Sequence, residues 1–265
     1  MKCIICNHSM AYYFSKEFNA FNLSTVDYWR CTSCGFVISE THANMSLSNW
    51  ATLNHQYHST YQGTEISIDD PRWLMRLQEQ ATILCDASEI GLISRNGRWL
   101  DYACGDGKLS ELLEKEGLNL LKYDKYMPSK DDYLRDTDLT PGSFDFVITT
   151  SFFEHLTKRD QFDTVEALVS ANGVFGIHTM VCEDVPKDPE WFYLLPVHCA
   201  FHTNKSMSLL FQEWGYSSSV YHVDSRLCLW FKQPGSDIQQ KIERANLRQN
   251  KPEYIYKKGF VDYWK

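Results

Sequence analysis

Long apolar segments are absent from this chain of 265 residues, and no run approaches the ~20 apolar residues that a membrane-spanning helix needs. The first ten residues, MKCIICNHSM, have neither the apolar core nor the cleavage site of a signal peptide. Basic residues are also scarce, since 26 lysines and arginines stand against 34 acidic residues and give a net charge of −8. Nucleic-acid binding needs a concentrated basic surface. The composition therefore disfavours a nucleic-acid partner, and we expect a cytoplasmic protein without a membrane span.

Internal repeats and low-complexity segments are absent too, while apolar residues make up 43% of the chain and allow a large packed core. The cysteine count of nine is odd, so one thiol must stay unpaired in any disulfide framework, which favours a reducing compartment. Five cysteines are scattered singly and are interpreted as small apolar core residues: Cys85, Cys104, Cys182, Cys199 and Cys228.

The other four cysteines form two close pairs, in CIIC and CTSCG, and the second pair begins 25 positions after the first pair ends. Two thiolates from each of two tight turns give the tetrahedral geometry that zinc accepts. The spacing predicts a structural zinc ribbon over residues 1–45, and its ligands are Cys3, Cys6, Cys31 and Cys34. The alternatives are chance pairing or a redox-active pair. The histidines at positions 8, 42, 55 and 58 are expected to be solvated.

Strand-like and helix-like segments alternate from about residue 97 onward. Strands are predicted over 97–103, 119–124, 143–153, 173–181 and 226–232, and helices over 109–115, 159–171 and 204–214. This alternation predicts an α/β fold, a Rossmann-like doubly wound and mostly parallel sheet with helices on both faces, over residues 96–233. Residues 46–95 are predicted to form a helical linker or lid, with a short helix, a loop and a helix that starts at 69–71 and runs to about 93. The tail, 234–265, is predicted to be a peripheral helix with a loose end.

The first predicted strand ends in the turn DYACGDG, which indicates a nucleotide site. In doubly wound sheets, ligands lie beyond the carboxyl ends of the strands, where glycine lets the backbone approach a ligand closely. Gly105 and Gly107 suit that task, and Asp124, 17 residues after Gly107, suits a ribose diol. A dinucleotide-binding dehydrogenase is disfavoured, because Ser110 stands at the third glycine position. A buried carboxylate at Asp101 favours a cationic ligand group.

The segments WLDYACGDG, FDFVITTSFFEHL and NGVFGIHT resemble, in this order, motifs of class I S-adenosylmethionine-dependent methyltransferases, with Ala103 in the place of the usual first glycine. The resemblance spans about residues 98 to 232 and implies that S-adenosylmethionine is the cofactor. It places Asp101 near the methionine amino group, Asp124 at the ribose, and Ala103, Cys104, Gly105 and Gly107 beneath the cofactor. The usual third strand must be short, and the acid that contacts adenine would be Asp136 or Asp138.

The cysteine pairs and the segment NHQYHSTYQG also resemble an N-terminal ribbon and tyrosine-rich segment that precede small methyltransferases of surface-polysaccharide and antibiotic sugars. By this resemblance Tyr57 and Tyr61 are candidates for the cofactor site or its lid, and a packed aromatic helix is the alternative.

A base for the methyl acceptor is expected in EWFYLLPVHCAFHT, which resembles a segment of the same subgroup, although Val197 replaces its glycine. His198 is the first candidate, because the unperturbed pKa of histidine lies near neutrality. Tyr193 would assist it or bind the acceptor, His202 is a rival base, and His155 is a third candidate.

These observations predict a methyltransferase that acts on a small polar acceptor, a nucleotide-linked or surface-glycan sugar. The alternatives are an RNA or protein methyltransferase that grips its substrate with the ribbon, and a non-catalytic scaffold that kept the fold. The glycines and acids of the nucleotide turn disfavour the scaffold, because a pocket that no longer binds a cofactor does not need them.

Overall fold

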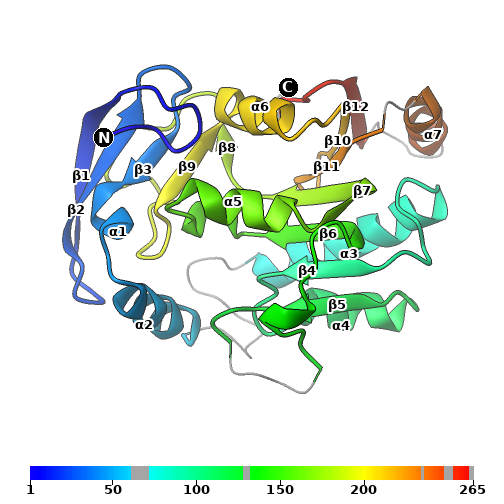
Figure 1. The fold of residues 1–265 in the computed structure, drawn as a ribbon, viewed down its shortest axis with the longest axis horizontal. Coiled ribbons are helices and arrows are strands. Elements are labelled where there is room, and N and C mark those ends of the chain that lie inside the picture. The colour runs from blue at the N-terminus through cyan, green and yellow to red at the C-terminus, as the bar shows by residue number, and fades with distance from the viewer. Residues whose placement is uncertain (61–71, 128–131, 234–235, 248–252, 263–265) are drawn as a thin grey trace.

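Two sheets, one of seven and one of five strands, organise the computed structural model, which describes residues 1–60, 72–127, 132–233, 236–247 and 253–262 (Figure 1). The predicted helix start at 69–71 lies outside these ranges. The strands are β1 (Met10–Phe18), β2 (Ser24–Cys31), β3 (Val37–Ser39), β4 (Trp99–Tyr102), β5 (Leu120–Tyr123), β6 (Phe144–Thr150), β7 (Val169–His178), β8 (Val181–Cys182), β9 (Ala200–Thr203), β10 (Ser218–His222), β11 (Leu227–Phe231) and β12 (Tyr254–Lys258). The helices are α1 (Glu40–Ala43), α2 (Leu47–His58), α3 (Trp73–Glu89), α4 (Lys108–Lys115), α5 (Arg159–Glu166), α6 (Asn204–Glu213) and α7 (Ser236–Asn246), with short 3-10 turns at Asp136–Asp138 and Phe153–His155.

The seven-stranded sheet has the order β12-β10-β11-β7-β6-β4-β5. The neighbours β5, β4, β6 and β7 run parallel, as predicted, whereas β11, β10 and β12 join the sheet through antiparallel pairs. The sheet is therefore mixed, and the prediction of a mostly parallel sheet is corrected in this half. The physical reason is the short connection between β10 and β11, which makes a hairpin and so enforces antiparallel pairing.

Helices cover both faces of this sheet. Alternate residues of a strand point to opposite faces, and Trp99 and Phe146 pack with α3, α4 and α7, whereas Leu100 and Val147 belong to the core beneath α5 and α6. The Trp99 and Phe146 rings meet edge to face at 5.2 Å. Burial of each such side chain stabilises the fold by about 1.5–3 kcal/mol.

The N-terminal strands are part of a larger sheet than a ribbon of residues 1–45 would form. Its order is β1-β2-β3-β9-β8, so two strands come from the segment that follows β7. β3 pairs with β9 in antiparallel fashion, and the Ser39 amide donates to the carbonyl oxygen of Cys199 at 2.8 Å. A boundary at residue 45 therefore does not separate two independent sheets, and Figure 1 shows β9 lying beside β3.

The tail is not peripheral throughout. It contains the predicted helix, α7, but β12 pairs with β10 at the edge of the main sheet. Tyr254 is only 2% exposed, and its hydroxyl donates to Asp86 of α3 at 2.6 Å. Phe260 and Val261 are buried as well. The prediction was incomplete because apolar and charged residues are mixed in this segment, so no clear strand pattern marks β12.

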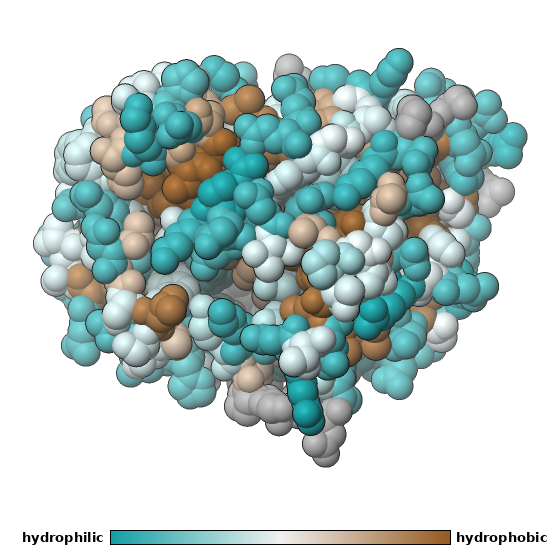
Figure 2. All heavy atoms as spheres, in the orientation of Figure 1, coloured by the Kyte–Doolittle hydropathy of each residue, from teal (hydrophilic) through white to brown (hydrophobic). Residues whose placement is uncertain are grey.

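The strand order reverses at β4, whose neighbours β5 and β6 lie on opposite sides. Beyond β5, the described residues form one parallel bridge, between Lys122 and Tyr133, which agrees with the short third strand expected from the sequence. Ligands of such sheets bind at this reversal, beyond the carboxyl ends of the strands. No helix among the described residues has the length and apolar character needed to cross a membrane. On the face drawn in Figure 2, hydrophilic residues dominate and apolar residues form small separate groups.

Candidate active site

A cavity of about 1130 Å³ lies at the carboxyl ends of β4, β5, β6 and β7, and residues of α2 and α3 line its other side. Ala103, Cys104, Gly105, Asp101 and Asp124 line one part of it. Tyr193 and His198 line the same cavity. The structure thus brings together the nucleotide turn and the segment predicted to supply the base.

The nucleotide turn adopts a backbone shape that suits glycine. Ala103, Gly105 and Gly107 have φ angles of 64°, 57° and 84°, in the left-handed region. The amides of Ala103 and Cys104 both donate to the carbonyl oxygen of Tyr123, at 2.8 and 3.1 Å, and so fix the turn to the end of β5. A Cβ at Gly107 would lie 2.7 Å from Cδ of Lys122. Gly107 therefore serves close packing at the start of α4, and it is not among the described residues that line the cavity.

Asp124 ends β5 and holds the turn from the other side. One carboxylate oxygen accepts from the Gly105 amide at 2.9 Å, and the other accepts from the amides of Tyr126 and Met127 at 2.8 and 3.0 Å. Burial raises the pKa of Asp124 above its ordinary value, whereas these three hydrogen bonds oppose the shift.

Asp101 is 1% exposed, and its Oδ1 has no hydrogen-bond partner among the described residues. Burial, helped by the charges of Asp124 and Asp106, raises the pKa of Asp101 to about 8. A buried carboxylate without a partner is costly, and a cationic group beside it would restore its ionised form. The α-amino group that S-adenosylmethionine carries is such a cation, so the residues present fit this cofactor.

The remaining cofactor candidates are placed differently. Asp136 is exposed and accepts from the Tyr123 hydroxyl at 2.9 Å, but the described lining includes Tyr123 and not Asp136 or Asp138. Tyr57, on α2, is 4% exposed and lines the cavity, with its ring 5.8 Å from that of Phe21. Tyr61 lies outside the described residues.

His198 is 7% exposed, and its Nδ1 lies 2.9 Å from the backbone oxygen of Tyr193. Because a carbonyl can only accept, this contact assigns the Nδ1 proton and leaves the lone pair on Nε2. The ring centroids of His198 and Tyr193 are 4.4 Å apart, and the ring of His155 meets that of His198 edge to face at 5.2 Å. Burial, and then the neighbouring His198 and His58, lower the pKa of His155 well below its ordinary value.

Glu154 is a buried carboxylate that sequence reasoning did not place in the site. It accepts from the Tyr193 hydroxyl at 2.5 Å and from Thr179 at 2.8 Å, and none of its surface is exposed. Burial raises the pKa of Glu154. Burial, and then the charge of Glu154, raise the pKa of Tyr193 well above its ordinary value. The position of Glu154 in FFEHL, four residues after the end of β6, was the signal that the sequence offered.

His202, the rival base, lies away from the cavity. It is fully buried in β9, where its ring is within 4.9–5.7 Å of the rings of Phe36, Phe162 and Phe153. Burial lowers its pKa to about 3. It is absent from the described residues that line the cavity, so the structure gives it no route to an acceptor. Of the histidines expected to be solvated, His42 is buried and bonded to Ser39, and His58 lines the cavity.

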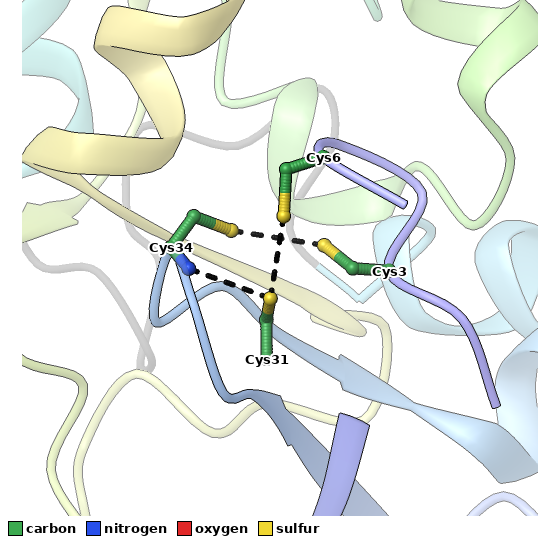
Figure 3. A group of neighbouring side chains, drawn as sticks. All are labelled: Cys3, Cys6, Cys31 and Cys34. Atoms are coloured by element: carbon green, nitrogen blue, oxygen red, sulfur yellow. Dashed lines mark hydrogen bonds between the residues drawn. The ribbon is translucent and has the colours of Figure 1, made fainter. Parts of the chain in front are cut away.

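The four paired cysteines meet at one point, and Figure 3 shows their sulfur atoms directed toward one another. All four Sγ atoms lie within 4.8 Å of one another, with Cys3 to Cys34 at 3.7 Å and Cys6 to Cys31 at 3.4 Å. These distances are too long for a disulfide of ~2.0 Å. They are close to the ~3.8 Å between two thiolates on a tetrahedral zinc ion with ~2.3 Å bonds. Amides of Ile5, Ser33 and Cys34 also donate to these sulfur atoms at 3.4 Å.

Two side-chain contacts connect this cysteine cluster with β9 and α6. The hydroxyl of Thr203, which caps α6, donates to the carbonyl oxygen of Cys34 at 2.5 Å, and Lys205 donates to that of Ser33 at 2.6 Å. Thr203 follows His198 by only five positions, so the cluster is anchored to the segment that carries His198.

The parallel half of the sheet has a glycine-rich turn after β4 and an acid at the end of β5, which are features of a nucleotide-binding α/β fold. The methyltransferase domain family matches residues 72–219, more than half of the chain, and the chain belongs to this family. It is an S-adenosylmethionine-dependent methyltransferase. No curated protein matches the sequence.

Solved structures similar to this chain share little sequence with it. One is a 1,6-didemethyltoxoflavin-N1-methyltransferase from Burkholderia thailandensis with bound S-adenosylhomocysteine: 14% identity, 75% of this chain and 95% of that chain, TM-score 0.48. Another is the magnesium protoporphyrin IX methyltransferase from Synechocystis PCC 6803: 11% identity, 69% and 95% of the two chains, TM-score 0.46. A third is a methyltransferase from Archaeoglobus fulgidus: 16% identity, 64% and 78%, TM-score 0.43.

The raised pKa of Asp101 leads to a pH-dependent affinity. An ammonium group beside Asp101 would favour the ionised carboxylate, so cofactor binding there below about pH 8 would release the proton of Asp101. The affinity for S-adenosylhomocysteine should therefore rise between about pH 6 and pH 7.5, by up to tenfold per unit. Calorimetry in buffers of different ionisation enthalpy would measure the released proton. An affinity that does not change with pH over this range, or that changes equally in Asp101→Asn, would contradict the placement of the ammonium group beside Asp101.

Proposed function

We propose that the chain transfers the methyl group of S-adenosylmethionine to a small polar acceptor, and that the acceptor is a nucleotide-linked or surface-glycan sugar. The observation that carries this proposal is the single cavity, which joins the Asp101 and Asp124 carboxylates to Tyr193 and His198. The sugar class rests on the sequence resemblance of the ribbon and of the segment 190–203.

The cofactor half of the cavity follows from its donors and acceptors. Asp101 binds the α-amino group, since its Oδ1 has no other partner among the described residues. Asp124 accepts from the ribose hydroxyls while its backbone bonds keep the carboxylate fixed. Ala103, Cys104 and Gly105 form the floor, and Gly107 allows the close packing beneath it. Asp136 accepts a hydrogen bond from the hydroxyl of Tyr123 and so positions this lining residue of the cofactor half. Tyr57 is a further part of the cavity wall.

In the acceptor half, His198 removes the proton. The Nδ1–H bond to the Tyr193 carbonyl holds the ring and directs the basic Nε2. Bound S-adenosylmethionine would supply the methyl group and leave as S-adenosylhomocysteine, and the proton of the acceptor oxygen or carbon would pass to Nε2 of His198. Tyr193, held by Glu154 at 2.5 Å, orients the acceptor by a hydrogen bond. Holding both reactants in one cavity converts the transfer into an effectively unimolecular step.

We also propose that Cys3, Cys6, Cys31 and Cys34 bind a structural zinc ion. Their separations suit a tetrahedral site, and a site with four thiolates leaves no position for a substrate. The ion would stabilise a short segment that has little core of its own. Through Cys34 and Thr203 it would also support the end of the acceptor segment.

Replacement of the base tests the reaction. His198→Ala should lower kcat by about 10²–10⁴-fold, because proton removal by a positioned base contributes that much. The affinity for S-adenosylhomocysteine should stay within a few-fold, since His198 lies outside the nucleotide turn. Turnover is measured as mass gain from labelled cofactor over a panel of nucleotide sugars, with His8→Ala, an exposed histidine outside the lining, as control. Unchanged turnover in His198→Ala would remove it as the base, and salt-sensitive RNA binding would favour the RNA alternative.

Removal of the metal tests the four-cysteine site. A strong chelator should loosen residues 1–39 and the paired strand β9, while the parallel half of the main sheet persists, because the core on its Trp99 and Phe146 face contains none of the four cysteines. Hydrogen exchange followed by mass spectrometry would show faster exchange in β1, β2, β3 and β9. Cys34→Ser should behave like the chelated protein. Unchanged exchange in the N-terminal strands, or loss of all protection, would contradict this arrangement.

A further inference from the structure

Histidine is concentrated in the active-site cavity. Of the nine histidines in the chain, five line it: His55, His58, His155, His178 and His198. Proton removal from one acceptor requires one of them. Neutral imidazole is the commonest protein ligand of transition metals, so this concentration raises the question of whether some of these rings meet in a geometry that fits a metal ion.

Two of the rings present suitable nitrogen atoms. Nδ1 of His198 is committed to the Tyr193 carbonyl at 2.9 Å, which leaves Nε2 as the atom with a lone pair. Nδ1 of His155 is buried and has no hydrogen-bond partner in the part of the chain that the structure describes. A buried ring nitrogen that makes no bond is costly unless a ligand completes it. The two rings are 5.2 Å apart, centroid to centroid.

A carboxylate completes the set. One oxygen of Glu154 and one nitrogen each of His155 and His198 lie within 4.8 Å of one another. Neighbouring ligands of a tetrahedral zinc ion are about 3.4 Å apart, so ring movements on the order of an ångström would close the site. Tyr193 and Thr179 hydrogen-bond the same carboxylate at 2.5 and 2.8 Å, which is the outer support that metal-ligating carboxylates have.

We propose that Glu154, His155 and His198 bind a second metal ion, a divalent transition-metal ion such as Zn²⁺. Two histidines and one carboxylate are a ligand set that zinc and ferrous iron use when they keep positions open for a substrate. His155 and His198 line the cavity, so the open positions would face the acceptor. The four-cysteine site differs in both respects, because it has only sulfur ligands and no open position.

The proposed ion changes the task of His198. The lone pair of its neutral ring lies on Nε2, and that lone pair can bind a proton or a metal ion but not both. An ion at this position would supply Lewis acidity toward an acceptor hydroxyl. In the metal-loaded protein His198 would therefore act as a ligand, and in the metal-free site as the base described above. This consequence rests on the proposed methyl transfer, whereas metal binding itself does not.

Cobalt titration tests the site without knowledge of the acceptor. The full chain, with its four-cysteine site filled by zinc and weakly bound metal removed, is titrated with Co²⁺. We expect one equivalent to bind with visible absorption bands of nitrogen and oxygen ligands and without a thiolate-to-cobalt charge-transfer band. His155→Ala and Glu154→Gln should each weaken this binding at least tenfold. His55→Ala, an exposed histidine of the same cavity outside the cluster, should leave it unchanged.

Binding of S-adenosylhomocysteine, measured on each variant, separates the possible failures. A variant that binds it is folded, so Glu154→Gln, which preserves size, remains informative if His155→Ala does not fold. No Co²⁺ uptake by wild-type protein that binds S-adenosylhomocysteine would overturn the second metal site and leave the methyl-transfer proposal intact. Loss of Co²⁺ binding in His55→Ala to the same extent, or Co²⁺ binding with thiolate-to-cobalt charge-transfer bands, would also overturn the second metal site. Metal uptake without S-adenosylhomocysteine binding would count against the proposed function instead.

Discussion

The buried carboxylate of Asp101 is the constraint around which the site is built. It is almost fully enclosed at the end of β4, and one of its oxygen atoms has no partner among the described residues. An unsatisfied buried polar group costs on the order of 1–3 kcal/mol, and more when it is charged. The apolar faces of the sheet offset this cost, and the raised pKa shows that the unliganded protein relieves it by keeping a proton. A cationic ligand would take the place of that proton, so under the proposed function the unpartnered carboxylate of Asp101 favours an ammonium-bearing cofactor.

The turn after β4 and the end of β5 form one rigid unit around this carboxylate. Tyr123 accepts two amides of the turn through its backbone, and Asp124 accepts a third. The acceptor half is held from a different direction, by the N-terminal sheet. The carbonyl oxygen of Pro196 accepts from His42 Nε2 at 2.9 Å, and that of Cys199 accepts from the Ser39 amide. The cofactor end therefore depends on the main sheet, whereas the segment of Tyr193 and His198 depends on the junction between β3 and β9.

Local patterns in the sequence were sufficient for the elements that carry the nucleotide turn. β4, β5, β6 and α4 lie where alternation and glycine placement predicted them. β10 was missed because Ser218 and Ser219 break the apolar pattern, although both are buried. The sheet formed by β3 with β9 was missed for another reason, since it joins segments about 160 residues apart and pairing at that separation leaves no local signal. The rival base His202 illustrates the same limit, because four positions along the chain place it among phenylalanine rings instead of at the cavity. Glu154 was quoted within a motif, but only the contact with Tyr193 reveals its place in the site.

The central claim is that the cavity beside Asp101 and Asp124 holds S-adenosylmethionine. Calorimetric titration of the zinc-loaded protein with S-adenosylhomocysteine, beside Asp101→Ala, tests it most directly. We expect micromolar binding by the wild-type chain and its loss in the folded variant, because the ammonium group would lose its only buried counter-charge at that oxygen. No binding by well-folded wild-type protein, or equal binding by Asp101→Ala, would contradict the claim and turn attention to a scaffold that kept the fold without its cofactor.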